Sequence, residues 1–218
     1  MIRAVIFDMD GVIIDSEKVY RKACTELVSE LGGKISVELF EKQMGLKMSE
    51  TQRVVVQTAG LDIEPEEFGR RYMERYLKLA RESLVPNPGL VNLLDFLSEK
   101  VGLAIASSTE KAAVEELMKK IGVLDYFEII VGGDEVDESK PSPMIYLRAS
   151  ELLGVNPEEC IVIEDSPNGI KSGIGAGMEV LGVRHGENVH LDLSASSHVF
   201  DDLYGVKKYL ETLLNGKA

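Results

Sequence analysis

The sequence has little of several things, and each shortage excludes a class of protein. Among 218 residues there are two cysteines and no tryptophan. Cys24 and Cys160 lie too far apart for metal-ligand spacing and are too few for a disulfide scaffold, so we expect buried thiols in a reducing compartment. No apolar stretch approaches the roughly 20 residues that cross a bilayer. A strand-like run follows Met1 almost at once and leaves no room for a signal peptide, which predicts a cytoplasmic protein without a membrane partner.

Basic residues are also scarce. The chain has 24 Lys and Arg against 37 Asp and Glu, a formal net charge of −13. This balance argues against a nucleic-acid partner, because phosphate backbones attract basic faces. A small phosphorylated substrate stays possible, since a few local cations would hold it. The hydrophobic content of 44% predicts an ordinary globular protein of one or two domains, and nothing demands more than a monomer.

Short apolar runs alternate with longer amphipathic stretches. The runs lack polar alternation, as is typical of strands covered on both faces, and strand–helix repetition predicts an α/β fold with a parallel sheet. The expected strands are Ala4–Phe7, Leu103–Ala106, Ile129–Val131, Ile161–Ile163, Val180–Val183 and a short sixth at His198–Phe200. The expected helices of this part are Gly89–Ser98, Lys111–Ile121, Pro143–Leu153 and Pro167–Ala176.

Residues 16–84 break this rhythm, because they contain helical patterns and no convincing strand. The longest pattern, Glu66–Ser83, carries a stripe at helical spacing that predicts core packing. The stripe consists of Phe68, Tyr72, Tyr76 and Leu79. A Pro- and Gly-containing linker at 85–89 follows. We therefore predict a helical insertion that covers the end of the first strand. The expected domains are an α/β core, 1–15 with 86–218, and a helical cap, 16–85.

The first expected strand ends in Asp8-Met9-Asp10-Gly11. Side chains at i and i+2 of a strand point the same way, so Asp8 and Asp10 could face one point. Two such charges repel each other unless a proton or cation intervenes, and Mg²⁺ prefers oxygen ligands. Gly11 permits a sharp turn away from the strand. The alternative is a simple acidic turn, since Asp and Gly both favour turns.

Three further sites follow expected strands or precede helices. Ser107 could hold a phosphate oxygen at a helix N-terminus, but with Glu110 it also forms a plausible capping box, which the local pattern favours. Pro141 keeps Lys140 extended before a helix predicted to be capped by Ser142, although most lysines are solvated.

Glu164 and Asp165 end another buried strand and fit a metal site shared with Asp8, or else the acidic first turn of a helix. Because ligands of open parallel sheets bind at the carboxyl ends of the strands, these sites should converge.

Other polar residues carry weaker signals. The acid pair Asp201-Asp202 fits the start of the last helix. The three histidines, His185, His190 and His198, form no nucleophile–base or zinc spacing, so solvated or structural roles are expected. Three basic residues of the insertion, Lys47, Arg71 and Arg75, could meet a substrate. However, Glu67 lies four residues before Arg71, so a solvated ion pair is the simpler interpretation there.

Taken in order, the motifs resemble the haloacid dehalogenase superfamily. The matching residues are Asp8-x-Asp10-Gly11-x-x-x-Asp15, Ser107, Lys140 before Pro141, and Glu164-Asp165. The resemblance is strongest to the β-phosphoglucomutase-like sugar-phosphate phosphatases. It implies a doubly wound, Rossmann-like core with a small helical cap and a Mg²⁺-dependent phosphatase of small phosphorylated metabolites.

The resemblance also implies roles. Asp8 would attack the phosphorus and form an aspartyl-phosphate, and Asp10 would act as acid and then as base. Mg²⁺ would be held by Asp8, the Asp10 carbonyl and Asp165, and by Glu164 directly or through water. Ser107 and Lys140 would hold the phosphoryl oxygens. Gly45-Leu46-Lys47 takes the place of the substrate-specificity loop, and Ser108 is a further candidate for substrate binding.

Two alternatives stay open. The first is a phosphomutase, in which this group has a histidine where the chain has Tyr20 and an arginine where it has Met48; both differences favour hydrolysis. The second is a phospho-accepting signalling module, which also uses an aspartate near Mg²⁺. Such modules lack a helical insertion after the first acidic strand, so we expect an enzyme.

Overall fold

The computed structural model describes residues 1–35, 48–186 and 188–216. The chain forms two compact units. An α/β unit comprises Met1–Asp15 and Val85–Ala218, and a helical unit comprises Ser16–Leu84. No helix in the described ranges is long and apolar enough to cross a membrane.

The α/β unit is built on a six-stranded sheet in the order β3-β2-β1-β4-β5-β6, with every neighbouring pair parallel. The strands are β1 (Ala4–Phe7), β2 (Gly102–Ala106), β3 (Ile129–Val131), β4 (Cys160–Glu164), β5 (Glu179–Val183) and β6 (His198–Phe200). All four side chains of β1 are fully buried. The predicted α/β class and all six strands are confirmed, because uninterrupted apolar runs suit strands covered on both faces.

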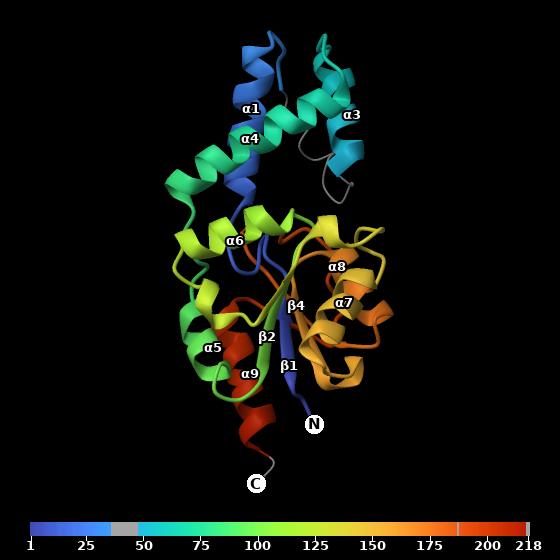
Figure 1. The fold of residues 1–218 in the computed structure, drawn as a ribbon. Helices are drawn as coiled ribbons and strands as arrows, with labels where there is room; N and C mark the ends of the chain where they lie inside the picture. The colour runs from blue at the N-terminus through green and yellow to red at the C-terminus, as the bar shows by residue number, and fades with distance from the viewer. Residues whose placement is uncertain (36–47, 187, 217–218) are drawn as a thin grey trace. The chain divides into compact units, whose positions relative to one another are not determined.

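Helices cover both faces of this sheet. They are α5 (Leu90–Leu97), α6 (Lys111–Lys120), α7 (Met144–Leu153), α8 (Pro167–Gly175) and α9 (Leu203–Asn215), with 3₁₀ turns η1 (Leu124–Tyr126), η2 (Gly133–Glu135) and η3 (Pro157–Glu159). In Figure 1, α5 and α9 lie on one side of the strands, and α7 and α8 lie on the other. On the latter side, Tyr146 and Ile145 of α7 belong to the same buried cluster as Ile6 and Val162 of the sheet.

Two helix N-caps follow the sequence and two do not. Ser166 accepts from Gly169 N at the start of α8, and Asp202 accepts from Gly205 N at the start of α9, as predicted. The start of α7 lies one residue later than expected, with Pro143 in place of Ser142 at its N-cap.

The capping box predicted for Ser107 and Glu110 is wrong. Helix α6 begins at Lys111, and Glu110 stands at its N-cap without a side-chain bond. Instead, Lys111 N donates to Asp134 of η2 at 2.8 Å. A long-range contact therefore caps this helix, and Ser107 is left outside it.

The helical unit contains α1 (Glu17–Glu30), α3 (Met48–Ala59) and α4 (Pro65–Ser83). The aromatic stripe of α4 packs as predicted: Phe68, Tyr72 and Tyr76 are buried, and the ring of Tyr76 stacks on Tyr20 of α1 at 3.9 Å.

The predicted Glu67–Arg71 ion pair is wrong in its partners. Glu67 pairs with Arg70, whereas Arg71 and Arg75 both reach Glu30 on α1. The contact between helices has displaced the pair expected within one helix. Gly45 and Lys47 lie outside the described residues.

The chain leaves and re-enters the α/β unit at adjacent points. Ile14 and Pro86 form an isolated antiparallel bridge. Asn87 N donates to Ile13 O at 2.8 Å, and Asn87 Nδ2 donates to the carbonyls of Gly11 and Val12, each at 2.9 Å. One asparagine thus ties the returning chain to the turn that follows β1.

Candidate active site

The predicted residues gather at the carboxyl ends of three adjacent strands. Asp8 follows β1, Ser107 follows β2, Glu164 ends β4, and Asp165 comes directly after it. Since β1 lies between β2 and β4, these residues meet at one edge of the sheet. Lys140, in the segment before α7, reaches the same point.

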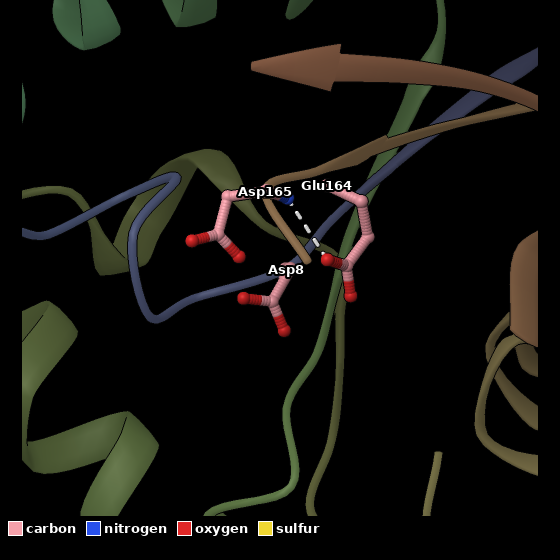
Figure 2. Close-up of side chains that lie close together, drawn as sticks. All are labelled: Asp8, Glu164 and Asp165. Carbon is pink, nitrogen blue, oxygen red and sulfur yellow. Dashed lines mark hydrogen bonds between the residues drawn. The ribbon is translucent and has the colours of Figure 1, made fainter. Parts of the chain in front are cut away.

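Three carboxylates form the centre of the site. Each of Asp8, Glu164 and Asp165 offers an oxygen within 4.8 Å of the others, and Figure 2 shows their side chains facing one another. In the described part of the chain no other group of three or more acidic, histidine or cysteine side chains meets this spacing. Asp8 and Glu164 are buried, and Asp165 is half-buried.

Lys140 provides the positive charge. Its Nζ lies 2.5 Å from Asp8 Oδ1, 2.8 Å from Glu164 Oε1 and 3.1 Å from Ala106 O. The side chain is only 8% exposed, which overturns the interpretation of a solvated lysine. Burial lowers the pKa of Lys140, but the charges of Asp8 and Glu164 together outweigh burial and hold the pKa well above its usual range. Lys140 is therefore a fixed cation.

Glu164 is saturated with donors. Its Oε1 accepts from Lys140 and from the buried hydroxyl of Tyr146 at 2.9 Å. Its Oε2 accepts from Asp165 N, Ser166 N and Ser166 Oγ at 2.9 to 3.0 Å, and the first of these bonds is the dashed line in Figure 2. Burial raises the pKa of Glu164, but Lys140 and these bonds lower it below its usual value, so Glu164 is ionised.

The pKa values of Asp8 and Asp165 are raised, in contrast to that of Glu164. Burial raises the pKa of Asp8 well above its usual range; Lys140 opposes this rise, and the charges of Glu164 and Asp165 add to it. Burial likewise raises the pKa of Asp165 to about 6, against a bond from His185. Three carboxylates around one ammonium leave negative charge in a low-dielectric place, which is costly unless a cation or protons offset it. Oxygen donors with excess negative charge suit a hard divalent cation such as Mg²⁺.

Asp10 lies beside the three carboxylates of Asp8, Glu164 and Asp165 but is not one of the group. Its Oδ2 accepts from Thr109 Oγ1 at 3.4 Å. Gly11 follows with φ +83°, the left-handed conformation that favours glycine, and turns the chain away as predicted. Thr109 is buried, and sequence reasoning missed it, although it follows β2 by only three residues.

The two serines after β2 differ in exposure. Ser107 is fully buried, and its Oγ accepts from Thr109 N at 3.1 Å. Ser108 is exposed. The hydroxyl of Ser107 thus closes a tight turn at the carboxyl end of β2, next to β1.

His185 was also missed. Its side chain is 19% exposed, and its Nε2 lies 2.8 Å from Asp165 Oδ2, so of the solvated and structural roles expected from the sequence the solvated one is wrong. The signal that could have found it is its position two residues beyond β5, at the same sheet edge as the acids.

Comparisons with known proteins agree with this arrangement. Residues 5–183 match the haloacid dehalogenase-like hydrolase family. The chain is 35% identical to a phosphorylated carbohydrates phosphatase of Thermotoga maritima over 187 residues, 85% of this chain and 87% of that protein. It is 29% identical to the β-phosphoglucomutase of Bacillus subtilis, over 85% of this chain and 84% of that protein.

A solved structure extends the likeness to three dimensions. The crystal structure of β-phosphoglucomutase from Clostridium difficile has a TM-score of 0.81 and 27% identity, covering 99% of this chain and 98% of that chain. The protein therefore belongs to the haloacid dehalogenase-like hydrolases and is an enzyme of that family, as its motifs indicated. Its relatives include sugar-phosphate phosphatases and β-phosphoglucomutases.

Proposed function

We propose that the protein is a Mg²⁺-dependent phosphatase of small phosphorylated metabolites, with sugar phosphates as the favoured class. The observation that carries the proposal is Lys140 Nζ within 2.5 Å of Asp8 Oδ1, beside the carboxylates of Glu164 and Asp165. An acid held against a fixed ammonium in an acidic cluster suits nucleophilic attack on a phosphate ester. The names of relatives that act on phosphorylated carbohydrates and fructose 1-phosphate support the substrate class.

In the proposed reaction, a carboxylate oxygen of Asp8 attacks the phosphorus, and the bond from phosphorus to the ester oxygen breaks. Asp10 gives its proton to the departing alkoxide, which leaves as an alcohol. Asp10 then takes a proton from water as the water oxygen attacks the phosphorus of the aspartyl-phosphate. Inorganic phosphate forms, and the carboxylate of Asp8 is restored. Lys140 and Ser107 hold phosphoryl oxygens throughout, and Lys140 limits the repulsion between Asp8 and the phosphate.

Asp8, Asp165 and the carbonyl of Asp10 would hold Mg²⁺, which would supply charge neutralisation and orientation of the phosphate. Glu164 was predicted as a ligand, direct or through water. Five donors already occupy its two oxygens, whereas an ionised carboxylate has about four lone-pair sites. We therefore assign Glu164 to holding Lys140 and the backbone of Asp165, without direct coordination.

Phosphomutase activity is the second candidate, because β-phosphoglucomutase is among the relatives. The position where those mutases are expected to have a histidine carries Tyr20, whose ring lies flat on Tyr76 in the packing of the helical unit. A stacked phenol of that kind contributes packing and is a poor proton carrier at neutral pH. This observation favours water as the phosphoryl acceptor.

Three expectations from the sequence stay predictions: the helical unit as a cap domain, the monomeric state and the cytoplasmic location.

The test is phosphate release from p-nitrophenyl phosphate and a panel of hexose phosphates, with Mg²⁺ and with a chelator. Asp8→Asn protein purified in the same way controls for contaminating phosphatases. We expect release that requires both Mg²⁺ and Asp8. Absence of metal-dependent release from every ester would contradict the proposal. Supplying β-glucose 1-phosphate with a bisphosphate primer separates the candidates, because a mutase forms glucose 6-phosphate without free phosphate.

A further inference from the structure

Two residues of the segment that follows β5 form hydrogen bonds with Asp165. His185 Nε2 lies 2.8 Å from Asp165 Oδ2, and with the proton on Nε2 the imidazole donates to the carboxylate. Asn188 Nδ2 donates to the main-chain carbonyl of Asp165 at 2.8 Å and to Val183 O at 2.9 Å. The same short stretch of chain thus fixes both the backbone and the side chain of one acid.

This arrangement is rigid. Asn188 is 2% exposed, and its Oδ1 accepts from His185 N at 2.8 Å, so the two residues brace each other. On the far side stands Gly11, where a Cβ would lie 2.1 Å from Asp165 Oδ2 and 2.8 Å from His185 Nε2. The turn after β1 therefore closes directly against the His185–Asp165 pair.

His185 acts on the acidic cluster through Asp165. The group of oxygens within 4.8 Å comprises Asp8, Glu164 and Asp165, and His185 is outside it. A carboxylate has two oxygens, so a bond that occupies Oδ2 leaves Oδ1 available to a cation. Groups that hydrogen-bond a metal ligand set its orientation, and their loss typically lowers metal affinity by about 10- to 100-fold.

We propose that His185 is a positioning residue that sets Asp165 for Mg²⁺, with Asn188 holding the backbone beneath it. The inference rests on the proposed function, because it assumes that Asp165 binds the metal. It adds one requirement to that function, which is a hydrogen-bond donor at the position of His185 Nε2. If His185 contributed only packing, a substitute side chain that supplies the donor would not restore Mg²⁺ binding.

The experiment measures binding of Mg²⁺ alone to the full chain, by calorimetry and by the Mg²⁺-induced rise in unfolding temperature. The variants are His185→Ala, His185→Gln and His185→Asn, with exposed His190→Ala as the matched control. Glutamine can place an amide donor near the position of Nε2, whereas asparagine is one methylene shorter and cannot reach it. We expect the Kd for Mg²⁺ to rise about 10- to 100-fold in His185→Ala and His185→Asn, and to stay near wild type in His185→Gln and His190→Ala.

Two results with the variants would overturn the inference. One is a His185→Ala protein that binds Mg²⁺ as tightly as wild type. The other is a His185→Gln protein as weak as His185→Asn, because packing and not the donor would then matter. If His185→Ala does not fold, the Gln and Asn pair still decides.

Failure of the proposed function has a different signature. Wild-type protein would then bind Mg²⁺ but release no phosphate from any ester, while the His185 variants still ranked as expected in affinity. Wild-type protein that binds no Mg²⁺ would overturn this inference as well.

Discussion

Lys140 bonds two acids at once, yet the pKa values of these two carboxylates shift in opposite directions. Glu164 receives the ammonium together with four other donors, and its pKa falls. Asp8 shares the same ammonium at 2.5 Å, but its pKa is raised by burial and by three nearby acids. One residue of the pair is thereby fixed as an anion that anchors the site. Asp8 is held in its charged form only by Lys140. Such a carboxylate suits the proposed role of a group that bonds to phosphorus and is released again.

The exchange Asp8→Asn tests this residue directly. We expect turnover to fall by at least about 10³-fold, because loss of a nucleophile removes the covalent route. The metal-free protein should unfold no more easily than wild type, because an isosteric amide relieves repulsion and Lys140 keeps Glu164. Phosphate release and urea unfolding in chelator check the two expectations. Substantial turnover in the variant would rule out Asp8 as the nucleophile.

Sequence reasoning found the residues whose positions follow from local pattern. Asp8, Ser107 and Glu164 could be placed because each ends an apolar run, and parallel strands bring their carboxyl ends together. Thr109 and His185 were missed because their roles come from contacts with Asp10 and Asp165, 99 and 20 residues away in sequence. No local pattern specifies such contacts.

For the secondary-structure elements, too, local features could be predicted and long-range contacts could not. The strands were predicted closely, since their unbroken apolar runs are typical of a doubly covered sheet. The cap of α6 was not, because the first amide of this helix donates to Asp134 from a separate turn. The partner of Glu67 was not, because Arg71 of α4 reaches Glu30 of α1 and Glu67 pairs with Arg70 instead. Tertiary contacts decided both of these features.

The start of α9 offers a test at the level of a single helix. Asp202 caps the helix by accepting from Gly205 N at 2.8 Å, whereas its exposed neighbour Asp201 does not cap it. We expect Asp202→Ala to lower the free energy of unfolding by about 1 kcal/mol, as for other N-cap deletions. Asp201→Ala should leave it nearly unchanged, and both should keep wild-type phosphate release. Equal stability of the two variants in urea unfolding would show that the cap contributes nothing.

For the whole molecule, the acidic cluster links stability to metal and pH. A folded-state pKa of about 6 for Asp165 exceeds the ordinary value of 3.8, so the metal-free fold binds a proton that the unfolded chain releases. Metal-free protein should therefore lose stability from this group as the pH rises from 3.8 to about 6. Mg²⁺ competes with protons for such ligands, so its binding should strengthen over the same rise.

We accordingly expect Mg²⁺ to stabilise the fold more above pH 7 than near pH 5. A cation at a hundredfold excess over its Kd stabilises the native state by about 2.7 kcal/mol. Unfolding temperatures measured with Mg²⁺ and with chelator, at matched ionic strength and at both pH values, give the comparison. An equal Mg²⁺ effect at the two pH values would contradict a site built from acids of raised pKa.

The bridge between Ile14 and Pro86 has a consequence for how such a chain can be altered. The two ends of the inserted segment are anchored side by side on the sheet unit, by Asn87 among others. A short turn joining Asp15 to Val85 would span this gap, so we expect residues 16–84 to be exchangeable as a block. The α/β unit and the inserted residues 16–84 are then separately replaceable parts, and a new insert could be grafted onto an unchanged acidic cluster.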